Sequence, residues 1–172
     1  VRVDPGGANL LRVEVSDRGE ISIHDLEIPG ASAAIGPERL YVSWDHDLRA
    51  YDYADPLRPV LLGSAYTSPD DPETTIVHGT TVYIGYDRFG YRPADTVQAF
   101  DVSDPRNPVR RAAGGSLGVG AVISLERVED ELYVASSSAL RSLDLSDPAA
   151  PAPRPRRLSP VVSGGRIASL GD

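Results

Sequence analysis

The stretch FDVSDPRNPV, residues 100–109, recurs along this chain. Residues 51–60 read YDYADPLRPV and residues 143–152 read LDLSDPAAPA. A diverged copy is VEVSD at residues 13–17, where Arg18 replaces the proline. The aspartates that mark this step are 38, 49 and 43 residues apart: Asp17, Asp55, Asp104 and Asp147. A unit that repeats about every 43 residues predicts one supersecondary element stacked several times.

Each unit carries a second signal in the same phase. An apolar-Tyr-apolar triplet precedes every Asp-Pro step, at residues 40–42, 82–84 and 132–134, and turn-forming residues lie just before each triplet. Such runs indicate hairpins between short strands. For the second whole unit we expect strands at 74–77, 81–87, 96–102 and 108–114.

The segment between the triplet and the Asp-Pro step alternates in the way that a strand does. Around residue 50 we expect Leu48 and Ala50 on one face, and Arg49, Tyr51 and Tyr53 on the other, because successive side chains of a strand point to opposite faces. No window of the chain carries an uninterrupted helical stripe, and 15 Pro and 16 Gly are spread along it. The pattern predicts an all-β protein.

The Asp-Pro step has its own local physics. An Asp side chain can accept a hydrogen bond from its own backbone two residues on, and Pro fixes φ at the next position while barring the residue before it from helix. We therefore interpret Asp52, Asp101 and Asp144 as repeated turn residues rather than ligands. Each Asp-Pro turn lies between the third and the fourth strand of its unit.

Four short strands in about 43 residues have the size of a β-propeller blade. The pattern resembles that of the LVIVD-repeat family, in which an apolar-Tyr-Val strand precedes Leu-Arg-Val-x-Asp-Val-Ser-Asp-Pro. Residues 48–56, LRAYDYADP, and residues 140–148, LRSLDLSDP, carry the resemblance. The resemblance implies a propeller that is secreted or exposed on the surface of a bacterial or archaeal cell.

The repeats divide a single domain, 1–172, into blades. Residues 34–75, 76–120 and 121–160 each form a whole blade, and residues 1–33 together with 161–172 form one split blade. Two interpretations follow. In the first, the last strand joins the first three and closes a four-bladed ring, which the complementarity of the two ends favours. In the second, the chain is part of a larger propeller.

Composition excludes several classes of function. The formal net charge is −8, and no basic cluster is present of the kind that phosphate backbones require, so nucleic-acid binding is not expected. No apolar run is long enough for a membrane-spanning helix. With no cysteine, disulfides and thiolate chemistry are excluded.

The longest insertion is the loop at residues 86–95, YDRFGYRPAD. Aromatic and arginine side chains anchor interfaces, and loops on a rigid scaffold gather binding residues. The equivalent hairpin one blade earlier is WDHD at residues 44–47, which we expect on the same rim. The predicted partner-binding residues are Trp44, His46, Tyr86, Arg88, Phe89 and Tyr91.

No catalytic set, metal site or cofactor site emerges from the sequence. Asp45, His46 and Asp47 could donate ligand atoms, but one short cluster lacks the three or four convergent ligands that zinc needs. The three histidines are too scattered to form a triad. We therefore expect a non-enzymatic propeller that binds a protein or a glycan through one rim. The alternatives are a hydrolase or metal-dependent enzyme that uses the central channel, and a structural spacer or assembly module.

Overall fold

The computed structural model describes residues 2–3, 9–17, 20–67, 71–87, 97–111, 121–136, 139–148 and 151–154. Within these ranges every regular element is a β-strand, and the strands form four antiparallel sheets. Sheet 1 contains β1 (Arg2–Val3), β2 (Asn9–Val15) and β3 (Ile21–Pro29). Sheet 2 contains β4 (Ser32–Gly36), β5 (Arg39–Trp44), β6 (Asp47–Asp52) and β7 (Val60–Tyr66).

The other two sheets also have four strands each. Sheet 3 contains β8 (Asp71–His78), β9 (Thr81–Asp87), β10 (Val97–Asp101) and β11 (Val109–Arg110). Sheet 4 contains β12 (Val122–Val128), β13 (Glu131–Ser136), β14 (Leu140–Asp144) and β15 (Ala152–Pro153).

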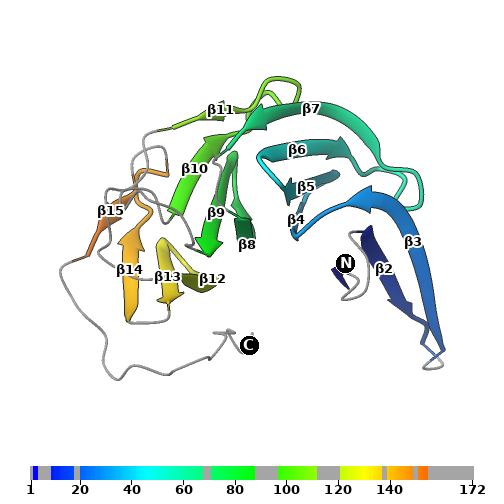
Figure 1. Ribbon diagram of the computed structural model, residues 1–172, viewed down its shortest axis with the longest axis horizontal. Helices are drawn as coiled ribbons and strands as arrows, with labels where there is room; N and C mark the ends of the chain where they lie inside the picture. The colour runs from blue at the N-terminus through cyan, green and yellow to red at the C-terminus, as the bar shows by residue number, and fades with distance from the viewer. Residues whose placement is uncertain are drawn as a thin grey trace.

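The sheets follow one another along a curved path, as propeller blades do. In each sheet, strands that are consecutive in the sequence pair with one another, as in the order β4-β5-β6-β7. Figure 1 shows the four sheets in an arc, with sheet 1 at one end and sheet 4 at the other. The first strands of sheets 2 to 4 lie together, since β8 contacts both β4 and β12. The expected all-β fold with propeller-like sheets is confirmed.

The hydrophobic core lies between sheets rather than inside any one of them. Strand alternation sends Leu40 and Val42 of β5 toward sheet 1 and Tyr41 toward sheet 3. The predicted alternation of β6 is confirmed, because Leu48 packs in the cluster with sheet 3 while Tyr51 packs in the cluster with sheet 1. A third cluster joins sheet 3 to sheet 4. Each inner sheet therefore shares its two faces with two neighbours.

The strands of the second whole unit match the prediction closely. β9 spans the predicted residues 81–87, and β10 and β11 lie inside the predicted ranges. β8 begins three residues earlier than expected, at Asp71, because a β-bulge between Pro72 and Thr74 lets the ladder continue to Asp87. The predicted closing strand, at 161–172, lies outside the described residues, so the four-bladed ring remains a prediction.

The repeated aspartates are turn residues, as the sequence indicates. The backbone N–H of the residue two positions on donates to the carboxylate of Asp52 at 3.0 Å, of Asp101 at 2.8 Å and of Asp144 at 2.8 Å. Within the same turns, Asp55 and Asp104 accept in the same way, each at 3.0 Å. Two consecutive side-chain-capped turns thus fix the path between the third and fourth strands of a blade.

These turns also receive the neighbouring sheet. The Tyr83 hydroxyl of β9 donates to the main-chain carbonyl of Pro148, in the Asp-Pro turn of sheet 4, at 3.0 Å. Burial raises the pKa of Tyr83 to about 12, so the phenol stays protonated and keeps its donor at neutral pH. Tyr83 of the repeated triplet therefore links sheet 3 to sheet 4.

One glycine marks the closest approach of two sheets, and it gives a first prediction. A Cβ on Gly63 of β7 would clash with the carbonyl oxygen of Arg106, a backbone atom in the turn between β10 and β11 of sheet 3. We expect Gly63→Ala to lower the free energy of unfolding by about 1–3 kcal/mol, the cost of forcing packed elements apart. Gly36→Ala is the matched control, because its Cβ would meet only side chains at ordinary distances of 3.6 Å and more. Equal urea midpoints for the two variants would contradict this account.

A hairpin turn gives a second prediction. Glu129 opens the β12–β13 turn with φ of 52°, a left-handed conformation that disfavours side chains, and Gly79 holds the corresponding position of the β8–β9 turn with φ of 55°. We expect Glu129→Gly to raise the free energy of unfolding by about 0.5–1 kcal/mol, since glycine adopts this conformation without steric cost. Thermal unfolding measures the effect. Gly79→Ala should shift the melting temperature in the opposite direction.

Candidate functional site

The β5–β6 hairpin forms one rim of the molecule. Its two-residue turn is Asp45-His46, and Asp45 takes the left-handed conformation with φ of 51°. Nearby, the Ser43 and Thr75 hydroxyls share a buried hydrogen bond of 2.7 Å, which joins sheet 2 to sheet 3. Because Thr75 pairs with Ile84, three residues before β9 ends at Asp87, the ends of β5 and β9 lie toward the same rim.

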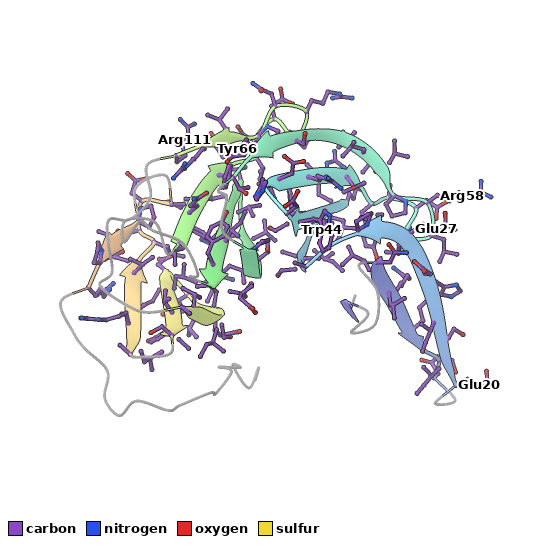
Figure 2. All side chains as sticks on the ribbon, in the orientation of Figure 1. Glu20, Glu27, Trp44, Arg58, Tyr66 and Arg111 are labelled. Carbon is purple, nitrogen blue, oxygen red and sulfur yellow. The ribbon has the colours of Figure 1, made fainter. Side chains whose placement is uncertain are left out.

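Aromatic side chains gather on this rim. Register pairs Trp44 with Asp47, and Asp47 in turn with Tyr66, so these three residues form one row across β5, β6 and β7. Directly opposed residues of an antiparallel pair lie on the same face. Tyr66 is 64% exposed, and Figure 2 labels Trp44 and Tyr66 on this sheet. We call Trp44, His46 and Tyr66 the aromatic rim.

Charged groups frame the aromatic rim. The His46 ring lies 6.2 Å from the Tyr66 ring in a tilted arrangement, and its Nε2 is 3.3 Å from the Asp45 carboxylate. The Arg49 guanidinium donates to the Asp47 carboxylate at 3.4 Å. The turn itself is held to β7, since the Thr67 N–H donates to the His46 carbonyl at 2.7 Å. The rim thus offers aromatic faces beside carboxylates on a hydrogen-bonded hairpin.

The structure brings together some of the predicted partner-binding residues and separates another. Trp44 and His46 lie at the β5–β6 hairpin, where the sequence places them, and their role in binding stays a prediction. Tyr86, by contrast, is not part of an exposed loop. It is fully buried and its hydroxyl donates to Gln98 at 3.2 Å, because alternation within β9 turns it with Val82 and Ile84 into the core between sheets 2 and 3. Arg88, Phe89 and Tyr91 lie outside the described residues.

Sequence reasoning missed Tyr66 and the charged pair beside it. Tyr66 is 20 positions from His46, at the end of a fourth strand, and only the strand register brings it to the hairpin. A β-bulge between Ala50 and Tyr51 shifts that register by one residue. A one-residue shift exchanges the two faces of a strand, so the pairing of Tyr66 could not be read from the alternating pattern alone.

The opposite rim, where the Asp-Pro turns lie, contains a small pocket between sheets 3 and 4. Its volume is about 180 Å³, and it is lined by Thr80, Thr81, Asp101, Arg111, Asp147 and Pro148. Asp101 accepts a hydrogen bond from Arg111 across this pocket. The hydrogen bonds from Ser103, and then the Arg111 contact, lower the pKa of Asp101 to about 2. The Asp101 carboxylate and the Arg111 guanidinium are thus engaged in holding the turn.

Other site chemistries receive no support from the described part of the chain. Among those residues, no group of three or more His, Asp or Glu side chains is placed to hold a metal ion. Over the same ranges, no helix has the length and apolar character to cross a membrane.

Comparisons with known proteins indicate fold only. No family model matches the chain, and no curated protein matches it. A solved protein of unknown function from Desulfotomaculum acetoxidans aligns with a TM-score of 0.64 at 15% identity, over 94% of this chain and 54% of its own. A candidate 6-phosphogluconolactonase from Bacteroides fragilis aligns with a TM-score of 0.62 at 11% identity, over 87% of this chain and 55% of its own.

A third structure, the computationally designed protein Ika4, aligns with a TM-score of 0.49 at 13% identity, over 66% of this chain and 64% of its own. The chain therefore spans about half of the length of the two natural proteins that it matches. The likeness to the two natural structures, at 11% and 15% identity, shows the fold of this chain but no activity.

The Asp101 site gives a prediction about acid stability. Because the folded protein lowers the pKa of Asp101 from 3.8 to about 2, the unfolded chain binds more protons between these values. The carboxylate therefore stabilises the fold fully above about pH 4, and this contribution is lost as the pH falls toward 2. Asp101→Asn keeps the acceptor for the Ser103 N–H but cannot titrate.

We expect the stability of the wild-type protein to fall more steeply than that of Asp101→Asn between pH 4 and pH 2. Urea unfolding at each pH measures the two slopes. Asp55→Asn, in a turn with a similar backbone hydrogen bond to its carboxylate, serves as a comparison. Parallel curves for wild type and Asp101→Asn would show that the carboxylate has the same pKa in both states.

Proposed function

We propose that this protein is a non-enzymatic binding module that engages a protein partner through the aromatic rim. The observation that supports the proposal is the row Trp44–Asp47–Tyr66 on an exposed hairpin edge. Tryptophan, tyrosine and arginine are the side chains that most often dominate the free energy of protein association. A glycan is the second partner class that this surface suits, because aromatic faces beside carboxylates offer apolar contact and hydrogen-bond acceptors together.

The position of the rim supports the same proposal. The hairpin belongs to sheet 2, which is packed against a neighbouring sheet on each face. The backbone of the hairpin is therefore fixed, while side chains at its tip project to solvent. Such loops on rigid scaffolds are common places for binding residues, because little conformational entropy is lost when they engage a partner. Arg88, Phe89 and Tyr91 come shortly after β9 in the sequence. We propose them as further residues that contact the partner.

We propose also that the four sheets are consecutive blades of a propeller with more than four blades. Two observations support the larger ring over the four-bladed ring that the sequence favours. Sheets 1 and 4 lie at opposite ends of the arc in Figure 1, and the two natural structures that align with the chain are about twice as long as the part that it matches. The resemblance to LVIVD-repeat propellers supports a secreted or cell-surface location.

The binding proposal predicts the effect of truncating the rim. We expect Trp44→Ala combined with Tyr66→Ala to weaken partner binding at least tenfold, since two aromatic anchors at an interface contribute more than about 1 kcal/mol each. Tyr66→Ala alone should change thermal stability little, because Tyr66 is 64% exposed, whereas Trp44 is half-buried, so thermal unfolding is measured to check that the double variant is folded. Binding is measured against partners captured from surface-protein and glycan arrays, which separates the two partner classes.

Two controls make this experiment specific. Leu57→Ala alters an exposed side chain of similar character, 52% exposed, in the Asp-Pro turn of the same sheet, and should leave binding unchanged. Tyr86→Phe removes a buried hydroxyl and should lower stability without altering affinity. Wild-type affinity in a folded Trp44→Ala/Tyr66→Ala variant would rule out the aromatic rim as the binding surface.

A further inference from the structure

One position of the third strand carries a polar side chain in sheets 2, 3 and 4, and an aliphatic residue of the second strand lies opposite it each time. The three pairs are Arg49 with Val42, Gln98 with Ile84, and Arg141 with Val134. Directly opposed residues of an antiparallel pair lie on the same face. The aliphatic partners all belong to the core between sheets. Each polar side chain therefore enters the interface with the preceding sheet.

In sheets 2 and 3 this polar side chain has a partner from its own sheet. Arg49 donates from Nη2 to the Asp47 carboxylate at 3.4 Å. Gln98, which is 1% exposed, accepts a hydrogen bond from the Tyr86 hydroxyl at 3.2 Å. Both partners come from the same end of their sheet, since Asp47 lies two residues before Arg49 and Tyr86 two residues after Ile84, which is opposite Gln98.

Sheet 4 carries the cation without such a partner. Ser136 occupies the register position that Trp44 has in sheet 2. Ala139 occupies the position of Asp47, and its carbonyl accepts a hydrogen bond from the Ser136 hydroxyl at 2.9 Å. Among the buried side-chain nitrogens and oxygens of the residues that the structure describes, the Arg141 Nε alone has no hydrogen-bond partner.

The surroundings of Arg141 make this arrangement unfavourable for the protein alone. Arg141 lies opposite Val134 and two residues before Leu143, and both of these side chains are buried in the cluster between sheets 3 and 4. Buried charges in proteins are normally paired, because an apolar interior does not replace the water that solvates them. Arg141 as a whole is half-buried, so a small molecule can reach it from solvent.

We propose that Arg141 binds a small organic carboxylate at the edge of the interface between sheets 3 and 4. The ligand takes the part at Arg141 that the Asp47 carboxylate takes at Arg49. A guanidinium suits this role because it stays charged and its planar fork matches a carboxylate. A small ligand is favoured over a folded partner because the side chain is half-buried. The site goes beyond the proposed binding through the aromatic rim, which lies on sheet 2.

Nuclear magnetic resonance on the intact chain tests the proposal, with sodium acetate as the probe. The signal to follow is the arginine Nε–H that disappears in Arg141→Gln. We expect it to shift and saturate with acetate. Acetamide, which has a similar shape but no charge, and sodium chloride at equal ionic strength should leave it in place. The Nε–H of Arg49, identified with Arg49→Gln, should respond at least tenfold less, because Asp47 already serves as its partner.

The controls decide between the possible results of this titration. An acetate shift that does not saturate, or one that sodium chloride reproduces, overturns the proposal. Sulfate that binds as tightly as acetate overturns the assignment to a carboxylate. Ala139→Asp supplies a carboxylate within the chain, at the position of Asp47, and should abolish the acetate shift. Far-UV circular dichroism checks that each variant keeps its β structure.

Thermal unfolding in carboxylate-free buffer gives a readout that a merely structural arginine would not produce. Arg141→Met keeps the apolar stem and removes the unpaired charge, so we expect its melting temperature to rise by about 2–4 °C. Arg49→Met is the matched control and should lower the melting temperature, because it leaves Asp47 without its partner. Acetate should raise the melting temperature of the wild type but not that of Arg141→Met.

Two results of the unfolding experiment contradict the proposal. A lower melting temperature for Arg141→Met would show that the guanidinium is already satisfied within the fold. An equal response of wild type and Arg141→Met to acetate would place the binding elsewhere. Neither result bears on Trp44 and Tyr66, so the outcome of the rim-binding experiment stays separate.

Discussion

Neighbouring sheets in this protein are held at a fixed separation by contacts that cross between them, and everything else in the fold depends on that separation. The second strands of sheets 2 and 3 send aliphatic side chains to one neighbour and a tyrosine to the other, so the core lies between sheets. Gly63 lets β7 approach the carbonyl of Arg106, and Tyr83 bonds to the Pro148 carbonyl. Stability is therefore a property of neighbouring pairs, as in other repeat proteins.

The repeat could be read from sequence because local rules determine it. Asp before Pro specifies a turn, and alternation specifies the two faces of a strand, so the turn role of Asp104 and the orientation of Leu48 and Tyr51 were predictable. The candidate site was predictable only in part. Tyr66 reaches the rim through a bulge-shifted register, which depends on pairing between distant segments that local pattern does not encode. Tyr86 turns inward by alternation within β9, whose span of 81–87 the sequence does predict, so its place among the loop residues was a wrong interpretation of a readable pattern.

The two rims divide structural and recognition roles between them. On the Asp-Pro rim, the carboxylates accept hydrogen bonds from nearby backbone N–H groups, and the Asp101–Arg111 pair is part of the turn. On the other rim, the described β5–β6 hairpin places Trp44 and Tyr66 beside Asp47. An exposed side chain such as Tyr66 can vary in identity without loss of a core contact, which suits this hairpin to recognition.

The acceptor for Tyr83 is a main-chain oxygen, and this has a consequence for how such a chain can change over generations. Because every residue type supplies a carbonyl, the residue at Pro148 can be replaced without loss of the chemical group that the tyrosine needs. A unit can then be duplicated, lost or exchanged without a compensating substitution next door. Chains built on this link are thus free to alter the number of units while each unit changes in sequence.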